Sequence, residues 1–341
     1  MTPGYFPAMN NSLRFLGCCL MLMAVAGEAR DKADRVILFP KLRVGQTLRY
    51  QIGYRAATNT TTESTVAAPM APAGGQINVN ILLQVEVEDL RIDAGKSLTR
   101  LRTRIVEPDA ATPAALAPAS TAAANAAQEP NDTGKSGERN RTVEFTLHAD
   151  GQVTDVEGLD KLSAGEQAAW QEWVARFGSG AAFPERGVKA GEKWKAEEPI
   201  TNALLTGLSW EKESEYVNNG PCSAMKLTAQ GEPAAGRQPQ ETCAVILTTA
   251  ILKQKSSPKD ATPEDYKLHD LRTMGAARGK NQIISYCSLK TGLVVRATED
   301  ANQSMSVIVA KTDGSNRVHY TIDAESHAQV LLLADAPANH P

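Results

Sequence analysis

The chain has little of what several functional classes require. It has no excess of positive charge, because 36 Lys and Arg residues stand against 39 Asp and Glu residues for a net charge of −3. That balance provides no general attraction to nucleic acid or anionic membranes, and we expect no nucleic-acid partner. No apolar stretch reaches the roughly 18 residues of a membrane-spanning helix, so we expect no transmembrane segment.

Linear motifs of catalysis are also missing. The sequence contains no G-x-S-x-G, H-E-x-x-H, C-x-x-C or glycine-rich phosphate loop. An S-x-x-K tetrad at 223–226 and a K-T-G triplet at 290–292 occur in penicillin-recognising enzymes, but no S-D-N element lies between them here. We therefore predict no catalytic residue, no cofactor and no metal site, and we consider an enzyme the less favoured class.

The best group of potential metal ligands lies near the C-terminus. His319 and His327 share the polar face of a predicted strand with Asp323 and Glu325. At about 3.3 Å per residue the two imidazoles lie about 26 Å apart, which is too far for one metal ion. Glu325 and His327 alone would need ligands from neighbouring strands. We therefore interpret this row as a solvated strand face.

An export signal is the clearest feature that is present. Arg14 precedes a short uncharged apolar run that ends in Ala24-Val25-Ala26. A basic residue, an apolar segment and a small-residue site together are typical of a secretory signal peptide. We predict that residues 1–26 are a signal peptide and that the protein is periplasmic or secreted. A lipid anchor on Cys18 is the alternative, although little apolar sequence precedes that cysteine.

Alternation of apolar and polar residues is the dominant pattern of the remaining sequence. Because successive side chains of a strand point to opposite faces, this period of two predicts strands with one buried face, as in antiparallel sheets. The pattern is clearest in residues 48–55, 77–88, 101–105, 143–148 and 318–332. Further candidate strands are 207–217, 223–229, 242–253, 278–288, 292–298 and 303–311.

One helix is well marked. Ser163 and Glu166 form a capping box, in which each side chain bonds a free backbone N–H at the start of a helix. An apolar stripe at helical spacing follows, and Gly178 is a stop signal. The stripe consists of Trp170, Trp173, Val174 and Phe177. With the strands, this predicts a mostly β (α+β) fold in which one amphipathic helix covers a large curved antiparallel sheet.

The organisation along the chain is predicted to be simple. Residues 27–335 form a single β-rich domain, and 336–341 form a frayed tail. Segments 56–76 and 107–141 are rich in small and polar residues and cannot bury enough apolar surface to offset chain entropy, so we predict disordered insertions. A faint similarity between two turns leaves open a division into two sub-halves that meet near 157–195.

Three cysteines remain after the predicted signal peptide. Cys222 follows a turn signal, Asn219-Gly220-Pro221, and Cys243 opens the next strong strand. Their strands are therefore expected to be sheet neighbours, which predicts a Cys222–Cys243 disulfide and a free, partly buried Cys287. A Cys243–Cys287 bridge is the alternative, because strands 242–253 and 278–288 could also pair.

Three segments carry a resemblance to known proteins. They are residues 143–153, with their strand and turn, the stretch from Phe183 to Trp194, and residues 286–295. The chain resembles uncharacterised exported bacterial β-rich proteins of no assigned function. Its long alternating strands with one helix also resemble the half-barrels of periplasmic lipoprotein carriers, which shelter acyl chains against a concave sheet face.

The resemblance implies an exported, non-enzymatic binding protein of the cell envelope. On this interpretation a lipid or another apolar ligand occupies the concave face of the sheet. Two other classes stay open at this point. One is an extracytoplasmic hydrolase whose residues converge only in three dimensions, and the other is a structural or adhesive surface module.

Overall fold

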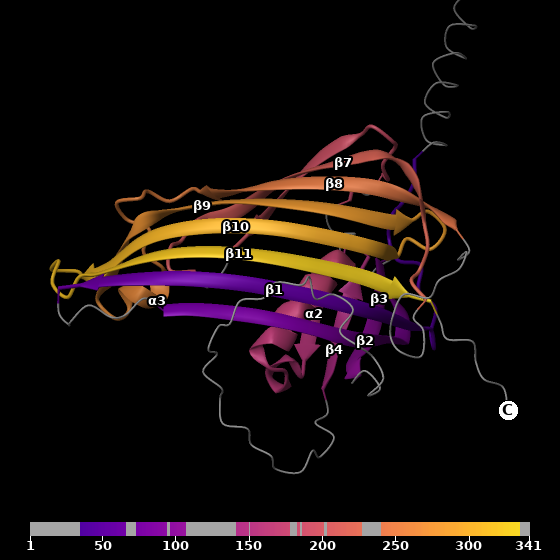
Figure 1. The fold of residues 1–341 in the computed structure, drawn as a ribbon, viewed down its shortest axis with the longest axis horizontal. Coiled ribbons are helices and arrows are strands. Elements are labelled where there is room, and N and C mark those ends of the chain that lie inside the picture. The colour runs from indigo at the N-terminus through magenta and orange to yellow at the C-terminus, as the bar shows by residue number, and fades with distance from the viewer. Residues whose placement is uncertain are drawn as a thin grey trace, which may run out of the picture.

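The computed structural model describes residues 35–65, 73–93, 96–106, 141–149, 151–177, 183–184, 186–200, 203–226 and 240–334. Eleven strands form one sheet in the order β5-β4-β3-β2-β1-β11-β10-β9-β8-β7-β6, drawn in Figure 1. All neighbouring strands are antiparallel. The strands are β1 (Thr47–Ser64), β2 (Ala73–Asp93), β3 (Lys96–Val106), β4 (Thr142–His148), β5 (Val153–Glu157), β6 (Lys193–Pro199), β7 (Leu208–Cys222), β8 (Glu241–Gln254), β9 (Leu271–Ser288), β10 (Val294–Lys311) and β11 (Val318–Leu333).

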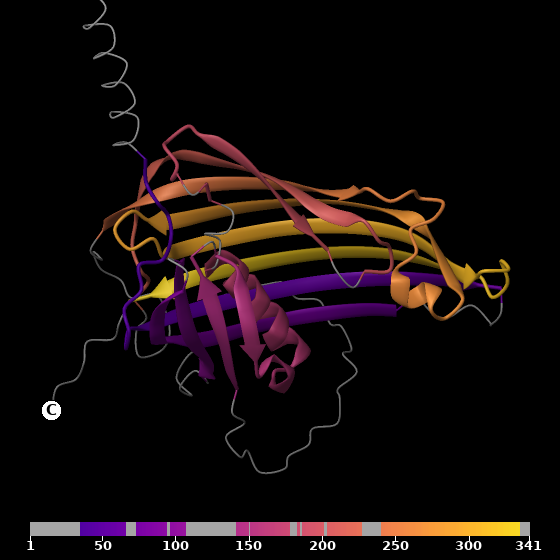
Figure 2. The same cartoon turned by 180° about the vertical axis from the view of Figure 1, so that it is seen from behind.

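The sheet is curved and one helix lies inside the curve. Figure 2 shows α2 (Ala164–Phe177) against one part of the concave face and α3 (Glu264–Lys267) near the other end. A 3₁₀ turn, η1 (Leu159–Lys161), precedes α2. Register shifts in β2, β7 and β10 mark β-bulges, which increase the local twist and bend a strand. The predicted mostly β fold with a curved antiparallel sheet and a covering helix is confirmed.

The start of α2 has the geometry that its sequence predicts. The Ser163 backbone N–H donates to Glu166 Oε2 at 2.8 Å, and the Glu166 N–H donates to Ser163 Oγ at 3.4 Å. Gly165, in the first turn of the helix, lies on Ile77 and Val79 of β2. The capping box therefore fixes where the helix begins, and its first turn packs on β2.

The main core lies between α2 and the strands beneath it. Trp170, Trp173 and Phe177 are buried, and the Trp173 and Phe177 rings stack with centroids 4.8 Å apart. The Trp170 indole N–H donates to Thr103 Oγ1 at 3.0 Å, while Phe145 meets the Trp170 ring edge-on. The apolar stripe predicted from the sequence is therefore the contact surface of α2 with the sheet.

A second, smaller core lies at the far end of the strands. It is formed by Leu205, Leu208, Leu252, Ala261 and Val307. These residues come from the segment before β7, from β7, β8 and β10, and from the connection between β8 and β9. Each of these two regions of the concave face is thus packed against other parts of the chain.

Cys222 and Cys243 form a disulfide with a Cα–Cα distance of 5.9 Å, and Cys287 is free and buried. The register explains the bridge, since Gly220 of β7 faces Cys243 of β8 and Cys222 faces Glu241. This is the pairing that the sequence analysis favoured over Cys243–Cys287.

The expected disordered insertion at 56–76 is wrong for most of its length. Residues 56–64 continue β1, and 73–76 begin β2. The run from Ala56 to Ser64 lacks apolar alternation, so sequence periodicity misses it. It is nonetheless strand because β11 pairs with it along its whole length, and its threonines suit an extended backbone.

Two other predictions are revised. Segments 292–298 and 303–311 belong to the single strand β10, because the polar residues between them stay paired with β9 and β11. Of the predicted strand 223–229, only residues 223–226 are described; Ser223 and Ala224 follow the end of β7, and Met225 makes an isolated bridge with Leu333.

Several predictions lie outside the described residues. They are the signal peptide 1–26, almost all of the segment 107–141, and the tail 336–341. Among the residues that the structure describes, no helix is long and apolar enough to cross a membrane.

Candidate functional site

An ionic cluster lies where α2 ends against the concave face of the sheet. Arg176 of α2 donates to Glu172 Oε2, one turn earlier, at 3.2 Å, and it also forms an ion pair with Glu299 of β10. The Asn281 side chain of β9 donates to Glu299 Oε1. The helix and two neighbouring strands therefore each supply part of one polar group.

Burial dominates the electrostatics of this cluster. The Arg176 and Glu299 side chains are only 12% and 8% exposed. Burial raises the pKa of the Glu172 carboxyl, and the positive charges of Arg176 and Lys212 counteract part of that shift. Burial also lowers the pKa of the Arg176 guanidinium. Tyr54 of β1 lies beside the cluster, and its pKa is raised by burial and by the negative charge of Glu172.

The cluster contains more carboxyl groups than cations. Lys212 of β7 pairs with Glu198 of β6, and both charges act on Glu172. Three carboxyl groups, those of Glu172, Glu198 and Glu299, thus lie near two cations, Arg176 and Lys212. Asn281 Oδ1 adds a buried acceptor that has no hydrogen-bond partner in the part of the chain that the structure describes. A group that carries positive charge or N–H donors would satisfy what this cluster leaves unpaired.

A strip of mainly small and apolar side chains, interrupted by the exposed Gln303, leads from the cluster towards the second core. On β10 the concave positions after Glu299 are Ala301, Gln303, Met305 and the buried Val307. Ala277 and Gly279 lie beside them on β9, and the Trp210 ring lies directly over Gly279. All but Val307 are at least partly accessible to solvent. The concave face therefore changes from ionic to apolar along the strands.

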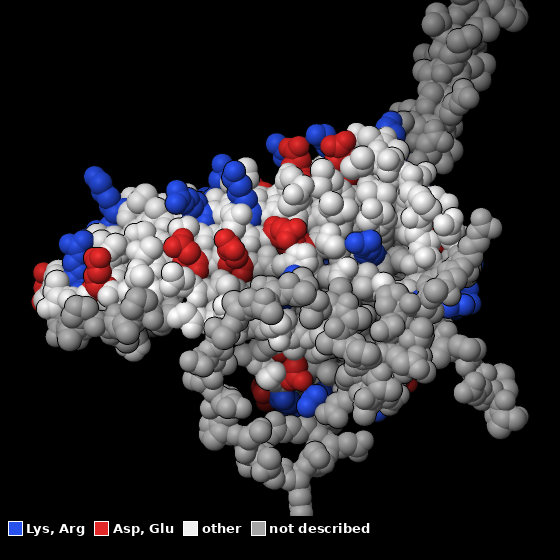
Figure 3. Space-filling model, viewed as in Figure 1, with Lys and Arg blue, Asp and Glu red and all other residues white. Residues whose placement is uncertain are grey.

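The convex face is polar and charged. Figure 3 shows basic side chains gathered above acidic ones on this side of the sheet. Arg278 and Lys280 of β9 share this face with Asp323 and Glu325 of β11, and β10 lies between them. At the centre of this face, on the described residues of β9, β10, β11 and β1, the side chains are mainly Asn, Gln, Thr and charged residues.

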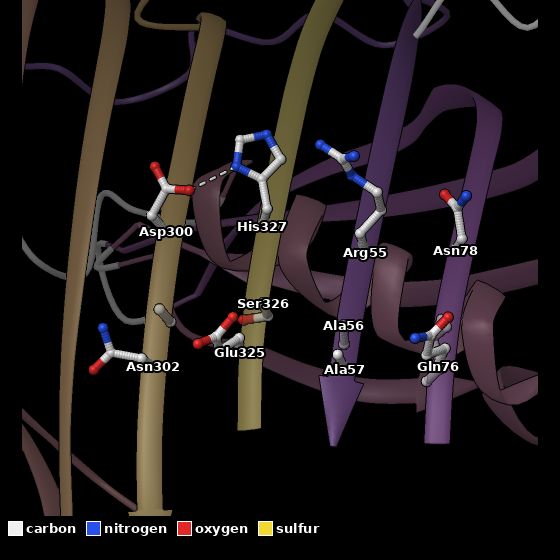
Figure 4. A pocket seen from close by; sticks show the side chains of 12 residues that line it. Arg55, Ala56, Ala57, Gln76, Asn78, Asp300, Asn302, Glu325, Ser326 and His327 are labelled. Carbon is white, nitrogen blue, oxygen red and sulfur yellow. Dashed lines mark hydrogen bonds and ion pairs between the residues drawn. The ribbon is translucent and has the colours of Figure 1, made fainter. Parts of the chain in front are cut away.

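A hollow of about 590 Å³ lies over these central strands. Asp300, His327, Arg55 and Asn78 form one row across β10, β11, β1 and β2, as Figure 4 shows. Asp300 Oδ1 and His327 Nδ1 are 2.7 Å apart, but the Asp300 side chain is 76% exposed. An exposed pair of this kind contributes little energy, and the concave cluster offers the more desolvated contacts.

His319, the other histidine of the predicted row, lies beside a hydroxyl and a carboxylate. Its Nε2 is 2.9 Å from Ser306 Oγ of β10, and its Nδ1 is 3.5 Å from Glu63 Oε2 of β1. A nucleophile, a base and a carboxylate in this order are the parts of a hydrolase triad. The Glu63 side chain is 86% exposed, however, and β10 is paired on both sides around Ser306, so its N–H groups are engaged in the sheet.

The structure keeps the two histidines at separate positions on the convex face of β11, each with its own partners. Among the described residues, no group of three or more His, Cys, Asp or Glu side chains could hold a metal ion. The K-T-G triplet forms the turn between β9 and β10. Gly292 has a φ of 70°, and a Cβ there would lie 1.9 Å from the Phe39 carbonyl oxygen, so the glycine is needed for packing.

Comparison with known proteins identifies no family. No protein-family model and no curated protein matches the chain. Among solved structures it is similar to a "putative lipoprotein" from Parabacteroides distasonis, at 8% identity over 88% of this chain and 98% of that one, with a TM-score of 0.28. It is also similar to the Pseudomonas putida toluene transporter TodX, at 8% identity over 85% and 89% of the chains, with a TM-score of 0.10. Scores this low carry no argument about fold or function.

Proposed function

We propose that this chain is a non-enzymatic binding protein of the cell envelope that holds an amphiphilic ligand, such as a lipid, on the concave face of its sheet. The single observation that supports this most is the ionic cluster of Glu172, Arg176 and Glu299 inside the curve, at one end of an apolar strip. A polar head would meet the cluster, and a hydrocarbon tail would lie along the strip towards the second core.

The dimensions of the strip suit such a ligand. Glu299 and Val307 stand eight positions apart on the same face of β10, which corresponds to about 26 Å along a strand. Removing apolar surface from water contributes about 25 cal/mol per Å², so a tail lying on the strip would add directly to affinity.

The unpaired acceptors favour a cationic head group. The cluster contains one carboxyl group more than it has cations, and Asn281 Oδ1 has no donor among the described residues. An ammonium group would supply both a positive charge and N–H donors, whereas a carboxylate head would face Glu172 and Glu299. The specific form of the proposal is therefore an amphiphile with an ammonium head.

Native mass spectrometry of the protein purified from its own host tests the proposal. We expect a mass above that of the chain alone. Solvent extraction should return the mass to that of the apo protein and should release an amphiphile. A mass equal to that of the chain alone, in protein purified from cells grown under different conditions, would count against a lipid ligand.

A second candidate function is an extracytoplasmic hydrolase, which the Ser306–His319–Glu63 arrangement favours. It ranks second because Ser306 lies on an exposed sheet face without an evident pair of backbone N–H donors for an oxyanion. A fluorophosphonate probe decides between the two. Covalent labelling of Ser306 that disappears in His319→Ala would support the hydrolase, and an unlabelled protein would leave the binding function.

A further inference from the structure

The concave strip that begins at the ionic cluster meets a barrier at its far end. Gln303 of β10 is exposed and Met305 is partly accessible, but Val307, the next concave position, is fully buried. Val307 packs in the second core with Leu205 and with three further residues, Leu208, Leu252 and Ala261. A molecule that lies along the strip would therefore meet packed side chains at Val307.

Hydrogen bonds hold this barrier in place. The Thr206 N–H, before β7, donates to the Ala261 oxygen at 2.9 Å, and Ser256 Oγ donates to the Thr206 oxygen at 2.6 Å. Thr273 Oγ1 of β9 donates to the same Ala261 oxygen at 2.8 Å, and the Ala261 N–H donates to the Thr273 oxygen at 3.0 Å. The segment before β7 and the connection between β8 and β9 are therefore fixed to each other and to the sheet. Figure 2 shows α3, which belongs to this connection, at the end of the strands away from α2.

The strip before the barrier has a floor of small side chains. Gln303 of β10 pairs with Gly279 of β9 on one side and with Ala324 of β11 on the other. The Trp210 ring lies over Gly279 and occupies the β9 side, whereas Ala301 and Ala324 are partly accessible. One hydrocarbon chain would therefore lie over β10 and β11.

We propose that the barrier limits the tail of the ligand to a single alkyl chain of about 15 carbons. Ala301 is the first concave position of β10 after the cluster, and Val307 stands six positions further on, which is about 20 Å along a strand. A carbon–carbon bond of about 1.5 Å advances an extended chain by about 1.3 Å, so about 15 carbons fill this length. The inference rests on the proposed function and adds the length of the tail to it.

A tail shorter than this length should bind more tightly with each carbon that is added. Burial of one methylene group strengthens binding about fourfold. A tail that is too long for the strip must leave its last carbons in water or bend away from the floor. The affinity should therefore stop rising once the tail reaches the barrier.

A series of primary n-alkylammonium ions tests the limit. The series runs from about 8 to about 20 carbons, which brackets the expected length. Each ion competes with trimethylammonium-diphenylhexatriene for the protein, below the concentration at which it forms micelles. We expect the affinity to rise about fourfold per carbon up to about 15 carbons and then to stay level.

Two variants should move this break in opposite directions. Ala324→Leu places a larger side chain on the strip before the barrier and should stop the rise at shorter chains. Leu205→Ala removes part of the barrier and should let the rise continue to longer chains. Ala276→Leu is the matched control for the first variant, because it adds the same side chain at an exposed position on the convex face of β9. Circular dichroism checks that each variant is folded.

The possible outcomes separate this inference from the proposed function. No binding at any chain length would overturn both. An affinity that rises without a break up to the longest chain would leave an amphiphile-binding protein and overturn the length limit. A break at the same length in the wild type, Ala324→Leu and Ala276→Leu would also overturn it, and this comparison decides the matter if Leu205→Ala does not fold.

Discussion

At the scale of single residues, the protonation of Glu172 makes the stability of the protein depend on pH. Its pKa is raised on folding from an ordinary value of 4.5, chiefly by burial. The folded chain therefore holds a proton that the unfolded chain releases, and stability falls as the pH rises from that ordinary value through the raised pKa. Glu172→Gln should remove this fall, as measured by urea unfolding over a series of pH values.

Glu144 is the matched control, because its pKa is shifted in the opposite direction to that of Glu172. The hydrogen bond from Arg102 is the largest cause that lowers its pKa below the ordinary 4.5. Its contribution is present above that value and is lost as the pH falls through the lowered pKa. Glu144→Gln should flatten only the acid side of the profile. Identical profiles for both variants would contradict this assignment of the two carboxyls.

The cysteines allow a second test at this scale. The bridge between Cys222 and Cys243 closes a loop with a sequence separation of 21, and replacing both by serine should cost about 3 kcal/mol of unfolding free energy. Burial raises the pKa of Cys287 to about 12, so this thiol should resist alkylation until the chain unfolds. Urea unfolding of the double variant measures the first effect, and alkylation with and without denaturant measures the second. A cross-linked peptide that contains Cys287 in a non-reducing digest would refute the assignment.

The cysteine pair was predictable from the sequence, whereas the ionic cluster was not. Cys222 and Cys243 lie in consecutive strands joined by a turn-containing loop, so local patterns place them together. Glu172 and Arg176 sit in one helix, but Asn281 and Glu299 lie on strands more than a hundred residues later. Only the curvature of the sheet and the position of α2 bring the four together, and neither can be read from residue spacing.

At the scale of elements, α2 is the part that the concave face depends on. Trp173 is fully buried and contacts the rings of Tyr50, Phe145, Trp170 and Phe177. Trp173→Ala should destabilise the protein by about 3–5 kcal/mol through lost contacts and a cavity. Gln171→Ala, at an exposed position of the same helix, should change it by less than about 0.5 kcal/mol. Urea unfolding compares the two, and equal effects would show that α2 does not pack as described.

Elements with strong local signals were predicted, and those without them were not. The capping box and apolar stripe identify α2, and strict alternation identifies residues 77–88 of β2. The distal half of β1, from Ala56 to Ser64, has no apolar alternation, and its composition predicts a disordered insertion. Its order comes from backbone pairing with β11, a non-local interaction that leaves no mark in the segment itself.

At the scale of the whole molecule, the curved sheet separates two chemically different faces. The convex face carries exposed charges and two histidines with separate partners. The concave face holds two apolar cores at its ends and an ionic cluster with an apolar strip between them. This asymmetry is the basis for placing the ligand inside the curve, and it makes the head group and the tail separately testable.

The most direct test of this placement is a titration with two fluorescent probes that share a tail and differ in charge. We predict that trimethylammonium-diphenylhexatriene, which supplies the positive charge of the proposed head group but no N–H donor, binds with a rise in fluorescence and that diphenylhexatriene propionate binds at least tenfold more weakly. Glu172→Gln should abolish most of that preference, whereas Glu211→Gln on the exposed face of β7 should not. No fluorescence rise with either probe, or equal binding of both that Glu172→Gln leaves unchanged, would contradict the account.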